Sequence, residues 1–559
     1  MDRLFNRCLV LALLASSLFP SAAAAIDRPT ARTLTAVYYD GPEQLNYLGS
    51  RFDVWHVERT LGYAAISLRP EQAEQLARAG FRMAALPEEL GLSAAKLDER
   101  YFYYDEFVTN GRSRYLADVL PQVAADYPQL TELFDLGDGW ETANGGHPRD
   151  ILAMRITNED PAYGPIDEKP AFFLYANTHA REVATPELAL RYIALLLKGF
   201  RGAGGYGIDA DTSWLVDHHV AYVLVMHNPD GHAVNEENTS AGRRKNLNDT
   251  DGCGFQAFVG VDLNRNHSFL WGCCGGSSGD PCNDVYRGSG PASEPEVQAF
   301  QGFFASVMED QNGPNGDNEI PPAAPNDTSG LFISLHSYSD LVLWPWQFYD
   351  FGPAPNAAAL EAMGKKFAFF NGYDPIGDIG YEVDGATDDW VYGKFGIPGF
   401  TFEVGSAGFG GCSGFFPDYG CIDGSAGRSF WDENRPAFVY AHKIAGAPYT
   451  AVYGPDAAVP VVSGGGSELD LNATIADRRV NGEPEHQLIA AEYFVDQPGE
   501  PGSGQPMAPS DGAWDETQEE VEAILDTSGL EPGLHYVLVR GQTAPGAWGP
   551  LTAAWFEVE

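Results

Sequence analysis

The chain has 559 residues, which is enough for several domains with large cores. It carries 78 acidic residues against 34 lysines and arginines, a formal net charge of −44 at pH 7. Such a surface repels nucleic-acid backbones and anionic membranes, so we expect neither a nucleic acid nor a membrane as partner. The simplest interpretation of the charge is a solvated surface that keeps an exported protein in solution.

Residues 1–25 are expected to be a secretory signal peptide. Arg3 and Arg7 give a positive start, an apolar stretch begins at Cys8, and small residues run up to Ala25. No later run is long and apolar enough to span a bilayer. We therefore predict a protein that is secreted, either to a periplasm or to the extracellular medium.

Six cysteines follow the signal peptide, and an even number in an exported chain predicts disulfides. Cys412 and Cys421 bracket a short glycine-rich loop and are expected to pair. The connectivity of the other four stays open, since they lie close together in sequence: Cys253, Cys273, Cys274 and Cys282. A cysteine zinc site is the competing interpretation, which the export signal and the irregular spacings disfavour.

Residues 26–98 are predicted to form a small α+β unit. Strands are expected at 34–39, 63–68 and 81–86, and helices at 41–48 and 70–80. The unit carries no cluster of chemically reactive groups. Its pattern is consistent with a pro-segment and with an ordinary accessory domain.

Residues 99–450 alternate between strand and helix patterns. Strands are expected at 151–156, 171–175, 219–226, 331–335 and 399–404, and helices at 113–127, 186–197, 294–308, 357–370 and 430–444. This alternation predicts an α/β fold with a mixed, mostly parallel sheet flanked by helices. Active residues are then expected at the carboxyl ends of the strands.

The composition changes to that of a linker over residues 451–466, which end in Ser463 followed by three glycines. Short strand patterns separated by glycine and proline turns then predict a small β-sandwich over residues 467–559. This part resembles, weakly, the immunoglobulin-like modules of some exported bacterial enzymes. A stabilising role and a surface- or substrate-binding role are equally compatible with it.

Chemically suited side chains follow three of the predicted strands. His179 and Glu182 lie three residues apart on a turn between a strand and a helix, where they can converge on one divalent ion. The mixed nitrogen and oxygen donors suit zinc, although an isolated His-x-x-Glu pair is commonly accidental. His336 ends another strand and would complete the ligand set of a catalytic zinc site. Glu403 ends a third predicted strand, a position at which a carboxylate could act as a general base.

At this point the chain resembles the zinc metallocarboxypeptidase family, which includes the pancreatic carboxypeptidases and carboxypeptidase T. Seven blocks occur in the family's order across 101–447: Asn177–Glu182, Asn228–Gly231, Arg243–Lys245, Gly260–Asn266, Ser334–Tyr338, Asp389–Trp390 and Phe400–Glu403. Seven ordered blocks make the resemblance specific.

The resemblance implies one zinc ion, held by His179, Glu182 and His336, with Asp262 orienting His179 from behind. It also implies that Glu403 is the general base that activates water and that Arg244 polarises the scissile carbonyl. The substrate would be held by Asn264 and Arg265 at its terminal carboxylate, by Tyr381 closing over it and by Arg181 at a neighbouring subsite. For Arg181 and Tyr381, solubility and loop packing remain competing interpretations.

One position departs from the family's sequence pattern, and a second bears on the expected substrate preference. The family often has an aromatic residue where Arg243 stands, so the alignment of Arg243 and Arg244 is open to a shift of one residue. Asp388 falls where family members with an acidic residue prefer a C-terminal Lys or Arg, because a carboxylate at the pocket floor pairs with a cation. An equally weighted interpretation is that Asp388 caps the turn beside Asp389.

The resemblance gives the N-terminal unit a role as an inhibitory pro-domain, so the chain is expected to be a zymogen cut between Leu90 and Tyr101. The implied activity is removal of one residue from the carboxyl end of a peptide or protein. The alternatives are hydrolysis of cell-wall peptides by the same site and an inactive relative that acts in binding or adhesion. The acidic loop Asn248–Asp251 is either a calcium ligand or a solvated turn. The oligomeric state stays open.

Overall fold

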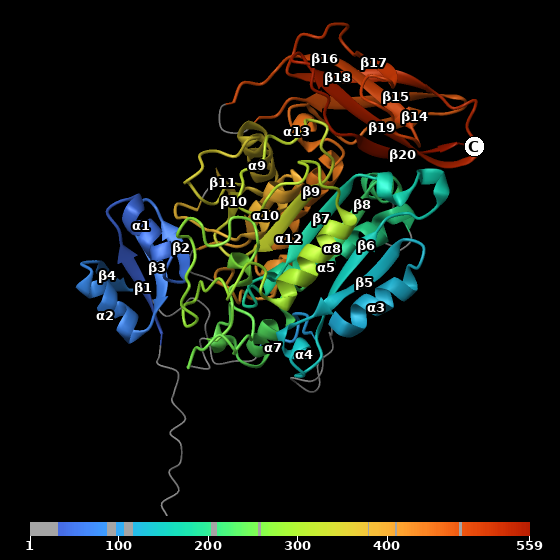
Figure 1. Ribbon diagram of the computed structural model, residues 1–559. Helices are drawn as coiled ribbons and strands as arrows, with labels where there is room; N and C mark the ends of the chain where they lie inside the picture. The colour runs from blue at the N-terminus through green and yellow to red at the C-terminus, as the bar shows by residue number, and fades with distance from the viewer. Residues whose placement is uncertain are drawn as a thin grey trace, which may run out of the picture.

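The computed structural model describes residues 32–86, 97–104, 116–202, 209–254, 259–377, 379–407, 411–479 and 483–558. The expected signal peptide and most of the expected cleavage region lie outside these residues. Figure 1 shows three parts in chain order: a small N-terminal unit, a large central sheet with helices and a C-terminal β module. Within the described residues, no helix is long and apolar enough to cross a membrane.

The N-terminal unit is a four-stranded antiparallel sheet, in the order β2-β3-β1-β4, with two helices. Its elements are β1 (Thr33–Tyr38), α1 (Pro42–Gly49), β2 (Val54–Glu58), β3 (Tyr63–Leu68), α2 (Pro70–Arg78) and β4 (Arg82–Ala85). The sequence pattern did not predict β2, an edge strand in which only Trp55 is buried, so it lacks the alternation of a half-buried strand. α2 begins at a proline and stops before Gly80, whose φ of 90° favours glycine.

The central domain contains an eight-stranded mixed sheet, in the order β11-β10-β12-β9-β7-β8-β6-β5, which confirms the predicted fold class. β7 is parallel to β8 and β9, and β9 to β12, whereas β5, β6 and β10 join by antiparallel pairing. The strands are β5 (Thr131–Asp138), β6 (Asp150–Ile156), β7 (Ala171–Ala176), β8 (Val220–Leu224), β9 (Leu331–His336), β10 (Leu341–Leu343), β11 (Asp374–Gly377) and β12 (Gly399–Glu403).

Helices cover both faces of this sheet, which explains why β7 is apolar along its whole length. Phe172 packs against Tyr192 and His442 on one face, while the next residue, Phe173, packs against Phe300 and other rings on the opposite face. The helices are α3 (Leu116–Asp126), α4 (Trp140–Ala143), α5 (Ala184–Gly199), α6 (Ala210–His218), α7 (Pro229–Glu237), α8 (Pro295–Val307), α9 (Ala357–Asn371), α10 (Thr387–Phe395), α11 (Gly420–Asp423), α12 (Phe430–Ile444) and α13 (Pro448–Ala451).

The parallel pairing brings three strand ends to one edge of the sheet. Ala176 at the end of β7 pairs with Leu335, one residue before His336, and His336 pairs with Glu403. Strands β7, β9 and β12 therefore deliver their carboxyl-terminal residues to the same place, as expected for a ligand site in an α/β fold.

The C-terminal module is built of antiparallel strands around its own core. Its strands are β13 (Asp456–Ala457), β14 (Val461–Gly464), β15 (Glu468–Ala476), β16 (Leu488–Val495), β17 (Gln505–Pro509), β18 (Gln518–Asp526), β19 (Gly533–Thr543) and β20 (Thr552–Val558). The prediction of a linker over residues 451–466 is wrong for the residues of β13 and β14, because these two strands pair with β15. The glycines that suggested a linker form the turn between β14 and β15, while the valines before them pair in the sheet.

The module packs on α6 through a shared apolar cluster that includes Trp214, Leu215 and Tyr536. Lys443 reinforces the interface by contacting Asp211 on α6 and Thr552 on β20. Because α6 leads into the amino end of β8, the module lies at the sheet edge opposite to the gathered carboxyl ends.

All six cysteines beyond the expected signal form disulfides: Cys253–Cys282, Cys273–Cys274 and Cys412–Cys421. The expected Cys412–Cys421 pair is confirmed, and the competing cysteine zinc site is wrong, because these thiols are consumed in disulfide bonds.

Candidate active site

Three predicted ligands converge at the carboxyl edge of the sheet. Nδ1 of His179 lies 2.7 Å from Oε1 of Glu182, and Nδ1 of His336 lies 3.1 Å from Oε2 of the same carboxylate. The two Nδ1 atoms are 3.1 Å apart, and all three side chains are buried. Among the described residues this is the one group of three metal-binding side chains with ligand atoms all within 4.8 Å.

The donor set fits a zinc ion. Two imidazole nitrogens and a carboxylate are a common ligand set of catalytic zinc. Oε2 of Glu182 is buried, and Nδ1 of His336, 3.1 Å away, makes no well-aligned hydrogen bond with it, so a cation would satisfy this oxygen. Burial opposes the charge on Glu182, but the imidazoles of His179 and His336 outweigh it and hold the pKa of Glu182 well below its usual range.

Asp262 links the metal ligands to Arg244. Its Oδ1 accepts a hydrogen bond from Nε2 of His179 at 3.2 Å, which leaves Nδ1 to face the cluster. Its Oδ2 accepts two hydrogen bonds from Arg244, from Nε at 3.0 Å and from Nη2 at 2.8 Å. Asp262 therefore lies where an orienting carboxylate was predicted.

Arg244, rather than Arg243, reaches the site. Nη1 of Arg244 lies 3.2 Å from Nδ1 of His179, whereas Nη2 of Arg243 donates to the carbonyl of Asn246 at 2.7 Å. The geometry thus favours the predicted alignment of this pair without a shift.

Glu403 lies at the same carboxyl edge of the sheet as the three predicted ligands. It ends β12 directly opposite His336 and lines the cavity that contains the three ligands. Burial raises the pKa of Glu403 to about 8, and the nearby carboxylate of Glu182 acts in the same direction.

Asn264 and Arg265 line the same cavity. Arg265 donates from Nε to the carbonyl of Gly276 at 3.1 Å and from Nη1 to the carbonyl of Asn264 at 2.9 Å. Oδ1 of Asn264 accepts hydrogen bonds from the backbone and the hydroxyl of Thr387, at 2.9 and 3.0 Å. These contacts fix a guanidinium and an amide next to the ligand cluster.

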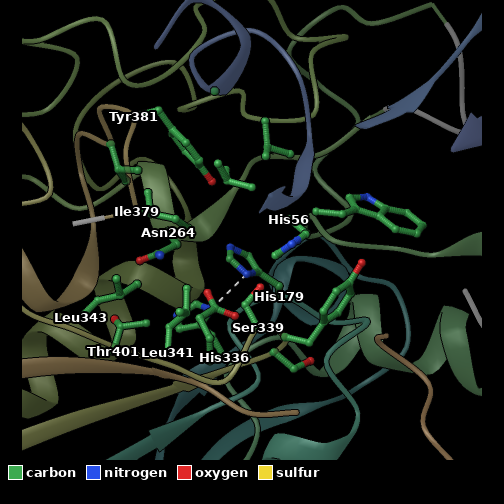
Figure 2. A pocket seen from close by; sticks show the side chains of 18 of the residues that line it. His56, His179, Asn264, His336, Ser339, Leu341, Leu343, Ile379, Tyr381 and Thr401 are labelled. Carbon is green, nitrogen blue, oxygen red and sulfur yellow. Dashed lines mark hydrogen bonds between the residues drawn. The ribbon is translucent and has the colours of Figure 1, made fainter. Parts of the chain in front are cut away.

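The cavity measures about 420 Å³ and is lined by the central domain and the N-terminal unit. Figure 2 shows the rings of His179 and His336 close together, with Asn264 and Tyr381 around the same space. Asp388 also lines it and accepts a hydrogen bond from the Thr401 hydroxyl at 3.3 Å. Burial raises the pKa of Asp388.

Arg181 and Tyr381 face the N-terminal unit. Arg181 forms a two-pronged ion pair with Asp53, with Nη1 to Oδ2 at 2.5 Å and Nη2 to Oδ1 at 2.8 Å, and both side chains are 3 % exposed. The ring of Tyr381 lies against Gly49, at which a Cβ would come within 2.2 Å of it. Burial raises the pKa of Tyr381 to about 12.

The sequence analysis missed Asp53 and its neighbour Trp55, whose indole also donates to Asp53. An aspartate that precedes an edge strand has no characteristic spacing, so only the three-dimensional contact with Arg181 reveals it. In the acidic loop at 248–251, the Asn248 side chain accepts hydrogen bonds from Thr250 and donates to Asp251 and Glu294, the pattern of a capped turn.

Two histidines and a glutamate gathered at the carboxyl edge of a mixed sheet are typical of a metal-dependent enzyme with an α/β fold. The family model described as "Zinc carboxypeptidase" matches residues 116–430, and the chain belongs to this family.

Curated relatives agree with this assignment. Carboxypeptidase A1 of Rattus norvegicus is 29% identical over 297 residues, which is 52% of this chain and 61% of the relative. Carboxypeptidase B of Rattus norvegicus is 27% identical over 300 residues, or 52% of this chain and 62% of that protein. The match thus spans less than two thirds of the length of these relatives.

Solved structures share the fold. Carboxypeptidase A from Helicoverpa armigera superposes with a TM-score of 0.55 at 19% identity, covering 74% of this chain and 98% of that chain. Thrombin-activatable fibrinolysis inhibitor superposes with a TM-score of 0.51 at 18% identity, covering 75% and 99%.

Proposed function

We propose that this chain is the exported precursor of a zinc-dependent carboxypeptidase, which removes the last residue of a peptide or protein. The observation that carries the proposal is the convergence of the His179, Glu182 and His336 cluster with Glu403 and Arg265 on one cavity. The three disulfides support export, since such bonds persist in oxidising compartments.

Several residues that line the cavity have a part in the proposed reaction. Arg265 and Asn264 bind the terminal carboxylate of the substrate, for which a planar guanidinium is suited. His179, Glu182 and His336 would hold a zinc ion, which would supply a Lewis acid for the scissile carbonyl and lower the pKa of water.

Proton transfer and charge stabilisation fall to the protein. Glu403 takes a proton from the attacking water and gives it to the nitrogen of the leaving amino acid as the C–N bond breaks. Arg244 donates hydrogen bonds to the carbonyl oxygen as negative charge develops on it. Tyr381 covers the bound substrate once the N-terminal unit has left.

The test is a panel of hippuryl dipeptides that differ only in the last residue, applied to the chain after proteolytic removal of the N-terminal unit. We expect release of one free amino acid, abolished when the terminal carboxylate is amidated, since Arg265 then loses its ionic partner. Cleavage of internal peptide bonds, or equal turnover of the amide, would contradict the proposal, and no turnover would favour a binding protein.

We further propose that Asp388 selects a C-terminal Lys or Arg. Asp388 lines the cavity beside Thr401, and a buried carboxylate at that place would pair with a cationic side chain. Asp388→Asn should lower kcat/KM for hippuryl-Arg by roughly 30-fold or more, as expected when a buried charge pair loses one partner. Hippuryl-Phe serves as the control and should change little. If the unmodified enzyme cleaves hippuryl-Phe far faster than hippuryl-Arg, Asp388 does not set specificity.

The N-terminal unit is proposed to be an inhibitory pro-domain. Asp53 of this unit forms an ion pair with Arg181, and Gly49 packs against the ring of Tyr381. Neither of these two residues can then contact a peptide substrate. Burial opposes the charge on Asp53, but Arg181 outweighs it and holds the pKa of Asp53 well below its usual range.

Asp53→Ala should therefore weaken inhibition by the N-terminal unit by about 100-fold, because it leaves Arg181 buried without its partner. The measurement is the rate of hippuryl-substrate cleavage by the uncut chain, compared with the fully processed enzyme. Asp40→Ala, which changes an exposed aspartate of the same unit, is the matched control. An uncut Asp53→Ala chain as silent as the Asp40→Ala chain would show that this ion pair does not carry the inhibition.

A further inference from the structure

Two loops meet in direct backbone contact behind Arg265. We call them the disulfide loop, Cys273–Ser277, and the tyrosine loop, Tyr381–Thr387. A Cβ on Gly276 of the disulfide loop would lie only 2.6 Å from the Cα of Val383 in the tyrosine loop. The two backbones can approach this closely because position 276 has no side chain. The position of one loop is therefore fixed by the other.

Asp384 of the tyrosine loop joins the two. Its carboxylate is fully buried and accepts hydrogen bonds from the backbone N–H groups of Cys274 at 3.3 Å and Gly276 at 2.8 Å. The hydroxyl of Ser277 is a third partner. None of the ion pairs among the described residues includes Asp384, so its charge is offset by hydrogen-bond donors of the disulfide loop. Loss of that charge would leave these donors buried without a strong acceptor.

The disulfide loop in turn holds Arg265. The carbonyl of Gly276, whose N–H binds Asp384, accepts the Nε hydrogen bond of Arg265. The tyrosine loop touches Arg265 a second time, since a Cβ on Gly385 would lie 2.4 Å from the carbonyl oxygen of Arg265. One residue, Gly276, thus links the buried carboxylate to the guanidinium that lines the cavity.

The covalent link between Cys273 and Cys274 adds to this arrangement. It ties Cys273 to Cys274, whose backbone N–H donates to Asp384. The loop consequently has few ways to rearrange while its anchor to Asp384 is in place.

We propose that Asp384 is a positioning residue for the receptor of the substrate's terminal carboxylate. It holds the disulfide loop so that the carbonyl of Gly276 aims Arg265 into the cavity. A guanidinium binds a carboxylate well only when both of its donors are correctly directed, so a small displacement of this loop weakens substrate binding. The inference rests on the proposed function, because it assigns a purpose to the orientation of Arg265.

The test compares Asp384→Asn with the unmodified protein, both produced as the full chain and then processed by limited proteolysis. Asparagine has the same shape but replaces one acceptor oxygen by an NH₂ group, which opposes the N–H donors of the disulfide loop. We expect KM for hippuryl-Arg and hippuryl-Phe to rise about tenfold with kcat within twofold, a loss typical of removing a partner that orients a binding residue.

A binding measurement separates positioning from general damage. Arginine and phenylalanine carry the terminal carboxylate, whereas argininamide and phenylalaninamide lack it. Asp384→Asn should weaken binding of the two amino acids about tenfold and leave that of the two amides unchanged. Asp477→Asn, which alters a buried aspartate of the C-terminal module, is the matched control and should change neither.

Each outcome decides the proposal. Unchanged KM and an unchanged preference for the free carboxylate would overturn it, as would equal weakening of amino acids and amides. If Asp384→Asn does not fold, Ser277→Ala removes only one donor to Asp384 and should raise KM about threefold with the same selectivity. If the protein binds arginine better than argininamide but releases no amino acid, the proposed function is contradicted. The role of Asp384 is then decided by the binding measurements alone.

Discussion

Glu403→Gln is expected to lower kcat by about 10³-fold while KM and zinc content stay nearly unchanged, since removal of a general base costs on the order of 10²–10⁴. Glutamine keeps the size of the side chain at the end of β12 but cannot take a proton from water. Its position is fixed by the pairing of Glu403 with His336, so the substitution should remove the chemistry without moving the backbone.

The measurement is steady-state kinetics of the processed enzyme with elemental analysis for zinc. Glu492→Gln is a suitable control, because it neutralises another buried glutamate, paired with Arg540 in the C-terminal module. A Glu403→Gln enzyme with unaltered kcat would mean that another group is the base.

Glu182→Gln should abolish high-affinity zinc binding and lower the activity by more than about 10³-fold. The reason is that Glu182 contacts both histidines of the cluster and supplies the only negative charge of these three side chains. The amide is a poorer ligand and cannot offset the charge of the cation. Zinc content after dialysis and activity should fall together.

A graded comparison strengthens this test. Asp262→Asn removes a partner of His179 rather than a ligand, so it should cost only about 10- to 100-fold in zinc affinity or activity. Excess zinc should restore the activity of the Asp262→Asn enzyme more completely than that of the Glu182→Gln enzyme. Full zinc occupancy in Glu182→Gln would exclude Glu182 from the ligand set.

The sequence predicted the fold class and the metal cluster because both leave local signals. The largely apolar runs that become β7, β9 and β12 mark buried strands. β9 and β12 end on His336 and Glu403, and His179 lies three residues beyond the end of β7. Parallel pairing then brings His179, His336 and Glu403 together without any contact between neighbours in the chain.

Other features have no such local signal. Edge strand β2 has little alternation, and the glycine-rich turn after β14 looked like a linker although the preceding valines pair with β15. Asp53 is 128 positions away from Arg181 along the chain, so no spacing relates the two. The pairing of Cys273 with its neighbour Cys274 was one of several connectivities that four clustered cysteines allow.

The C-terminal module and the cavity lie at opposite ends of the parallel strands. The module packs on α6 at the amino ends of the parallel strands, while the cluster of His179, Glu182 and His336 lies at their carboxyl ends. If the module holds the enzyme on a solid support such as an insoluble polymer, the cavity lies at the end of the central sheet away from that support. Freely diffusing chain ends would then be within reach, and the support itself would not.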